Sequence, residues 1–65
     1  MKRYRDQYGA IIGVFEETRY YIGILRDGYL TEHPDSPQNW DEEWCEEYLD
    51  SLAEDNGWTE IEEAS

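Results

Sequence analysis

The chain has 65 residues, with 17 Asp and Glu against 5 Lys and Arg, so its formal net charge is −12. A chain this short forms one small domain and buries only about 60% of the surface that its unfolded form exposes. The composition excludes a disulfide framework, because Cys45 is the single cysteine. It also excludes a membrane-spanning helix, because no apolar run approaches about 20 residues.

The first predicted element is a β-hairpin within residues 8–26. Residues 8–15 and 19–26 are rich in β-branched and aromatic types, and their glycines make both segments poor helices. The Glu-Glu-Thr segment between them predicts a turn that places Phe15 opposite Tyr20, although a longer loop would shift this register. On that register, one apolar face of the hairpin comprises Ile11, Phe15, Tyr20, Ile22 and Ile24.

A loop over residues 27–36 and a helix over about 37–55 follow the hairpin. The helix has two candidate starts, either a Ser-Pro pair at its beginning or Asn39 as N-cap with Glu42 three residues later. Gly57 predicts the stop of the helix. An apolar stripe at three- and four-residue spacing comprises Trp40, Trp44, Cys45, Tyr48, Leu49, Leu52 and Ala53.

A short strand over about 57–62 is the last predicted element. The predicted fold class is therefore α+β, with a single acidic domain over residues 1–65 in the order β-β-α-β. One helix packs on a small three-stranded antiparallel sheet in this prediction. We expect Trp44, Leu49 and Leu52 of the helix to pack on the isoleucines of the hairpin.

The charge is distributed unevenly along the chain. Residues 1–26 hold all five bases and three acids, whereas residues 27–65 hold fourteen acids and no Lys or Arg. A negative field of this strength repels nucleic acid and anionic membranes, attracts basic surfaces, and costs stability through self-repulsion. The charge therefore predicts a partner with a basic surface.

Acidic residues fill the side of the predicted helix that the apolar stripe leaves. Helix neighbours three or four residues apart have Cβ atoms about 5–6 Å apart, so these carboxylates form rows at roughly the phosphate spacing of a nucleic-acid strand. An exposed Trp beside such rows suits an arginine-rich partner through cation–π contact. The predicted partner-binding residues are Asp41, Glu42, Glu43, Glu46, Glu47, Asp50, Glu54 and Asp55, with Trp40 and Trp58 at the two ends of the helix.

In size, charge and carboxylate rows, residues 27–65 resemble the small acidic proteins with which phages and mobile elements disable host nucleic-acid machinery. These are the anti-restriction proteins, the anti-CRISPR proteins and other DNA mimics, and the resemblance includes no shared sequence motif. It implies an inhibitor that occupies the nucleic-acid channel of a host defence complex. The implied partner is a basic nucleic-acid-binding protein, such as a CRISPR effector or a restriction-type complex. Direct binding to nucleic acid or membrane is not expected.

The residues predict no catalytic, cofactor or metal site. One His and one Cys are too few for a zinc site, and a calcium loop aligned on Gly57 has Leu52 where an Asp is required. Acidic neighbours of Cys45 suppress its thiolate. A domain this small also has little room for a catalytic pocket. We therefore expect a binding protein rather than an enzyme.

Two alternatives stay open. In the first, the chain is a phage or bacterial adaptor or regulator that binds its partner through exposed aromatic residues, and the charge only keeps it soluble. The second is self-association through an edge strand of the hairpin, so the expected oligomeric state is monomer or homodimer. The unpaired cysteine and the lack of a secretory leader predict a cytoplasmic location, which is the host cytoplasm if the protein is phage-encoded.

Overall fold

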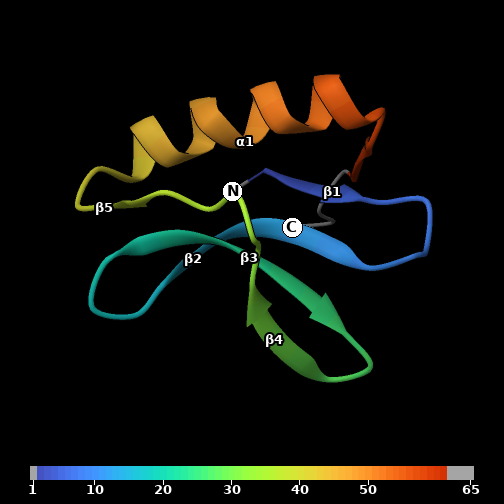
Figure 1. The fold of residues 1–65 in the computed structure, drawn as a ribbon, viewed down its shortest axis with the longest axis horizontal. Coiled ribbons are helices and arrows are strands. Elements are labelled where there is room, and N and C mark those ends of the chain that lie inside the picture. The colour runs from blue at the N-terminus through green and yellow to red at the C-terminus, as the bar shows by residue number, and fades with distance from the viewer. Residues whose placement is uncertain (1, 62–65) are drawn as a thin grey trace.

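A computed structural model describes residues 2–61 and shows one helix lying across one face of an antiparallel sheet (Figure 1). The strand order is β4-β3-β2-β1-β6. Both β4 and β5 pair with β3, along its C-terminal and N-terminal parts respectively. The elements are β1 (Arg3–Arg5), β2 (Ile11–Glu16), β3 (Tyr20–Arg26), β4 (Tyr29–Glu32), β5 (Gln38–Asn39), α1 (Glu42–Asn56) and β6 (Thr59–Ile61).

The predicted three-stranded β-β-α-β fold is wrong, because the sheet has six strands within residues 2–61. The missed strands β1, β4 and β5 have only two to four residues each, so their alternation is too short to stand out in the sequence. β4 returns along β3 through a two-residue turn at Asp27 and Gly28, whose φ angles of 53° and 81° suit a tight hairpin. The predicted loop over residues 27–36 therefore contains a strand.

The β2–β3 hairpin is one residue out of its predicted register. Phe15 pairs with Tyr21 and Glu16 with Tyr20, so the loop has three residues, 17–19, instead of two. A backbone hydrogen bond of 3.0 Å between the first and last loop residues closes it. The segment lacks the Gly or Asn that a two-residue turn requires, and the chain adopts the longer loop.

This shift turns β2 over, because neighbouring residues of a strand point to opposite faces of the sheet. Ile12 and Val14 are buried beneath α1. Ile11 and Phe15, which were predicted to face the helix, lie on the far face and are half-buried. β3 keeps its predicted orientation, so Ile22 is fully buried in the core.

The core lies between α1 and the near face of the sheet. A four-residue spacing turns Cys45, Leu49 and Ala53 onto the sheet, whereas Trp44 is rotated by about 100° from Cys45. Trp44 is therefore 42% exposed, so the prediction that it is a core residue is wrong. Leu52 is half-buried at the border of the core. The buried cluster comprises Tyr4, Ile12, Val14, Ile22, Cys45, Leu49 and Ala53.

The helix begins at Glu42, later than predicted. Its N-cap is Asp41, whose carboxylate accepts the N–H groups of the second and third helical residues at 3.0 and 3.4 Å. Neither predicted cap acts on the helix. The Ser36 hydroxyl accepts the Ile22 N–H at 2.7 Å, and Asn39 belongs to β5. Both residues contribute to the sheet instead.

The end of the helix agrees with the prediction. Gly57 has a φ of 72° and its N–H donates to the Ala53 carbonyl, so the predicted stop is confirmed. β6 follows it, and residue 62 of the predicted last strand lies outside the described residues. Within the described part of the chain, no helix is long and apolar enough to cross a membrane.

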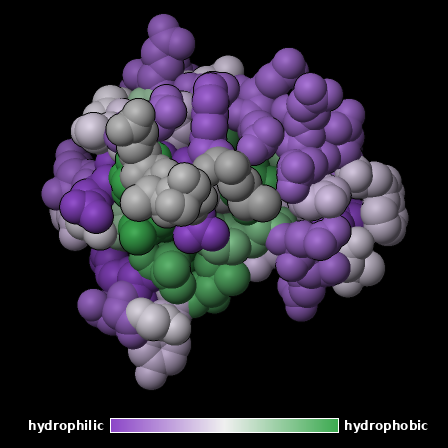
Figure 2. Space-filling model, turned by 180° about the vertical axis from the view of Figure 1, so that it is seen from behind, coloured by the Kyte–Doolittle hydropathy of each residue, from purple (hydrophilic) through white to green (hydrophobic). Residues whose placement is uncertain are grey.

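The far face of the sheet is packed around glycines. A Cβ atom on Gly23 would lie 2.8 Å from the Phe15 ring and 2.9 Å from Leu30, so this glycine leaves room for both side chains. The guanidinium carbon of Arg3 lies 5.1 Å from the centroid of the Phe15 ring. Figure 2 shows hydrophobic side chains gathered on the lower, sheet side of the molecule, with hydrophilic side chains above, where α1 lies.

Candidate binding surface on the helix

Two different flanks of α1 border its buried stripe. Successive residues of an α-helix are rotated by about 100°. Trp44 and Tyr48 therefore fall on one side of the stripe and most acids fall on the other. We call Trp44 and Tyr48, together with Trp40 just before the helix, the aromatic strip. The acidic flank comprises Glu43, Glu46, Glu47, Asp50 and Glu54.

Asp50 ties the acidic flank to β1. Its carboxylate accepts hydrogen bonds from Lys2 Nζ at 3.0 Å and from the Tyr4 hydroxyl at 2.5 Å. The hydrogen bond and the charge of Asp50 raise the pKa of Lys2. Burial, followed by the Asp50 hydrogen bond, raises the pKa of Tyr4. Asp50 was a predicted partner contact, but its charge already has partners within the molecule.

Asp41, another predicted partner contact, has a structural role as the N-cap. Burial, together with the charge of Asp41, raises the pKa of the Cys45 thiol. The Cys45 Sγ contacts the Tyr20 carbonyl at 3.7 Å. Cys45 is fully buried, so it acts as a small core residue.

The other six predicted acids differ in exposure. Glu42 and Glu46 are half-buried. The exposed ones are Glu43, Glu47, Glu54 and Asp55. Three of these lie on the acidic flank and span about 16 Å along the helix axis. We call Glu43, Glu47 and Glu54 the exposed row.

Trp40 lies at the surface, with 72% of its area exposed. Asn39 pairs with Tyr20, so the residue that follows β5 comes beside Arg19 of the β2–β3 loop. The guanidinium carbon of Arg19 lies 5.6 Å from the centroid of the Trp40 ring, within the range of a cation–π contact. The sequence prediction named Trp40 but did not single out Arg19, because the pairing of β5 with β3 was not foreseen.

Trp44 and Tyr48 form an aromatic pair on the helix. Their ring centroids are 5.7 Å apart with a tilt of 32°. They are 42% and 36% exposed, although both belong to the stripe that was predicted to be buried. Each precedes a core residue, Cys45 or Leu49, by one position. This offset of about 100° is the sequence signal that separates them from the core.

Trp58 is not part of the aromatic strip. It is half-buried, packs against the core, and meets the His33 ring edge-on at a centroid distance of 5.6 Å. Its backbone N–H donates to the Ala53 carbonyl at 3.0 Å. The structure therefore places this predicted partner contact in the packing beyond the end of the helix.

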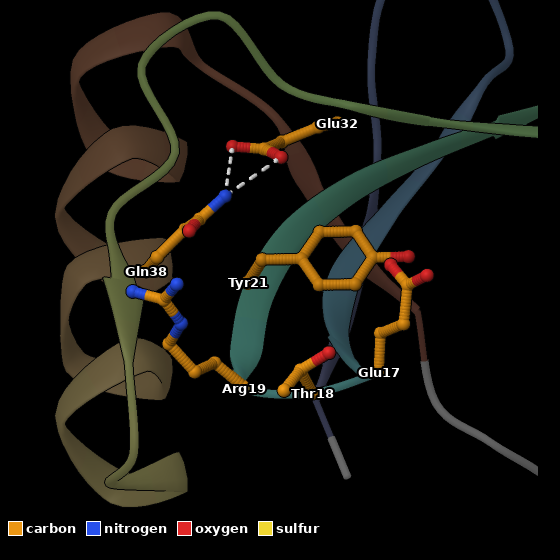
Figure 3. A pocket seen from close by; sticks show the side chains of 6 residues that line it. All are labelled: Glu17, Thr18, Arg19, Tyr21, Glu32 and Gln38. Atoms are coloured by element: carbon orange, nitrogen blue, oxygen red, sulfur yellow. Dashed lines mark hydrogen bonds between the residues drawn. The ribbon is translucent and has the colours of Figure 1, made fainter.

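A small polar cavity lies where the β2–β3 loop meets β4 and β5 (Figure 3). The Gln38 amide donates to both carboxylate oxygens of Glu32, at 3.2 and 3.4 Å. The volume is about 90 Å³, room for roughly three water molecules at about 30 Å³ each. A usual ligand pocket has about 300–1,000 Å³. The cavity is lined by Glu17, Thr18, Arg19, Tyr21, Glu32 and Gln38.

Comparisons with known proteins add no functional assignment. No protein-family model, curated protein or solved structure matches the chain. Among residues 2–61, no three His, Cys, Asp or Glu side chains are placed so that they could hold a metal ion.

Proposed function

We propose that the protein binds the basic nucleic-acid-binding surface of another protein through α1 and thereby keeps nucleic acid off that surface. The observation that carries this proposal is the exposed row on a helix without Lys or Arg. Ordinary solvated helix faces mix both signs of charge. Like charges four residues apart instead destabilise a helix by a few tenths of a kcal/mol per pair. A basic partner would offset this repulsion.

In the complex, the exposed carboxylates take the places of phosphates opposite Lys and Arg side chains of the partner. Four helical residues advance about 6 Å along the axis, so Glu43 and Glu47 are spaced roughly like neighbouring phosphates of one strand. Nucleic acid and the protein then compete, since both need the same basic side chains. Complementary charge also speeds the encounter and makes the association sensitive to salt.

The proposed target class is a host defence complex, so the proposed activity is anti-CRISPR-like or anti-restriction-like inhibition. Size, net charge and the exposed row support this by analogy with the acidic inhibitors that the chain resembles. The surface that the protein would occupy is a basic channel that otherwise holds DNA or a guide RNA. No catalysis takes part in this proposal.

Two triple variants with the same change in net charge test the proposal. The first reverses the exposed row by Glu43→Lys, Glu47→Lys and Glu54→Lys. The control reverses three exposed acids elsewhere by Glu17→Lys, Asp35→Lys and Glu60→Lys. Circular dichroism establishes that both variants are folded.

The immobilised proteins are then incubated with a bacterial lysate at about 50 mM salt. We expect the wild type and the control to capture a nucleic-acid-binding protein that added duplex DNA or RNA releases, and the row variant to lose it. Equal losses in both variants would mean that net charge alone matters. A captured protein that holds nucleic acid and this protein together, with undiminished affinity, would end the mimicry proposal.

A second candidate function, an adaptor that binds through exposed aromatic residues, is favoured by the aromatic strip. Its three rings lie partly or largely at the surface, with Trp40 the most exposed. The adaptor reading predicts binding that hardly changes with salt and survives reversal of the exposed row. It also predicts that Trp40→Ala abolishes binding, so the same capture experiment separates the two functions.

A further inference from the structure

We infer that the aromatic strip binds arginine side chains of the basic partner, and that Arg19 occupies the Trp40 position of the strip in the free protein. This inference rests on the proposed function and names the side chains that the surface selects. The strip consists of three large rings outside the buried core cluster. Monomeric proteins rarely expose such groups of apolar side chains unless the surface binds something.

The three rings lie on the same side of the molecule. Asp50 holds the opposite flank of α1 beside β1 through Lys2 and Tyr4. Tyr48 precedes Asp50 by two residues, about 200° of helical rotation, so it points toward the other edge of the sheet. That edge is formed by β4 and β5, and Trp40 follows β5 directly.

The contact between Arg19 and Trp40 shows which side chain the strip accepts. The guanidinium lies over the indole at 5.6 Å, as in a cation–π contact. A planar guanidinium can lie on an aromatic face and keep its N–H groups available for hydrogen bonds. The contact leaves Trp40 72% exposed, so a partner side chain can reach the same ring.

Acids beside the aromatic strip favour arginine over other occupants. Glu47, at the outer edge of the acidic flank, is three residues from Trp44 and borders the strip, whereas Asp55 is seven residues from Tyr48 and lies on the same side of the helix. An arginine that stacks on a ring can donate to such a carboxylate at the same time. An apolar partner would bury these carboxylates without compensation. A lysine carries the charge but lacks the planar group that stacks.

Two synthetic peptides test the inference with the full chain. They have equal length and charge, and one carries Arg among Gly and Ser residues where the other carries Lys. Affinity is measured by calorimetry at fixed salt, and the indole N–H signals are followed by NMR. We expect the arginine peptide to bind about fivefold more tightly. It should shift the signals of Trp40 and Trp44 and leave Trp58 unchanged.

Three variants locate the preference. Trp40→Leu with Trp44→Leu is expected to remove the preference for arginine, because the arginine peptide loses more affinity than the lysine peptide. Glu43→Gln with Glu54→Gln, on the acidic flank, is the matched control, which weakens both peptides equally and keeps the preference. Arg19→Gln removes the internal competitor, so the ratio of arginine to lysine affinity should rise about twofold or more.

The outcomes separate this inference from the proposed function. Equal affinity for the two peptides, no binding of either, or a preference that survives in the folded double Leu variant overturns the inference. The proposed function is decided separately, by capture with the exposed-row variant and its release by nucleic acid. If the exposed-row variant still captures the same protein and the arginine preference is intact, nucleic-acid mimicry is refuted. The aromatic strip then remains an arginine-binding surface.

Discussion

The helix and the sheet of this protein differ in charge. α1 has seven acids and no base, whereas all five bases lie in or next to the first three strands. One base, Lys2, joins the two regions through its ion pair with Asp50 at 3.0 Å. The sheet is therefore nearly balanced in charge, and the excess negative charge is concentrated on the helix.

This difference shows that the sheet stabilises a helix that is weak by itself. Like charges along α1 repel, and no base in its last turn interacts with the helix dipole. Short isolated helices are marginal even with favourable sequences. α1 therefore depends on its caps, Asp41 and Gly57, and on burying Cys45, Leu49 and Ala53 against the strands. Packing on the strands therefore stabilises α1, and α1 carries the exposed row.

Loss of contact between the helix and the sheet should have the largest effect. Leu49 is fully buried, so Leu49→Ala is expected to cost about 2–5 kcal/mol of unfolding free energy and could unfold the domain outright. Chemical denaturation followed by circular dichroism measures this cost. Leu52 is half-buried, so Leu52→Ala should cost clearly less. A larger loss at Leu52 than at Leu49 would contradict the assigned helix face.

Crowding on the far face of the sheet should have the next largest effect. A Cβ on Gly23 would lie 2.8 Å from the Phe15 ring, so Gly23→Ala is expected to destabilise the protein by about 1–3 kcal/mol. Gly13→Ala is the control, because the nearest side-chain atom there, on Arg3, is 3.2 Å away and can move. Equal thermal stability of the two variants would show that the far face is loosely packed.

The link between helix and sheet should fail at alkaline pH. The pKa of Tyr4 is raised by burial and by its hydrogen bond to Asp50, and the pKa of Lys2 is raised by the same carboxylate. Raised folded-state values mean that this stabilisation is fully present below pH about 10 and is lost as pH rises through them. Melting temperatures should therefore change little between about pH 8 and 10 and fall above about pH 10, less steeply in Tyr4→Phe. Parallel curves for both proteins would refute the role of Tyr4.

Relief of repulsion on the helix should have the smallest effect. Glu47→Lys removes like-charge pairs and places a base four residues after Glu43, so it should raise stability by about 0.5 kcal/mol at low salt. Added salt should stabilise the wild type more than this variant, because screening weakens repulsion. Glu17→Lys, in the β2–β3 loop, should change little. A melting temperature that does not change with salt concentration would indicate that the acids do not repel one another.

The helix stop and the location of the charge were predictable from local chemistry. Gly57 ends α1 because glycine adopts a φ of 72° without strain. The exposed acids were foreseeable because an unpaired buried carboxylate is costly. The helix start was not predictable, since Ser36, Asn39 and Asp41 can all cap a helix. Ser36 does not cap the helix, because its hydroxyl accepts the N–H of Ile22 on β3.

The sequence by itself determined the single small domain, the acidic surface and the presence of one helix on a sheet, because these depend on composition and local periodicity. Only the tertiary structure decided that Ile12 and Val14 face the helix, since one extra loop residue reverses every side chain of a strand. It also decided that Trp44 lies at the surface and that Asp50 is paired. The apolar stripe of α1 is wider than the side of the helix that the sheet covers, so Trp44 and Tyr48 remain partly exposed.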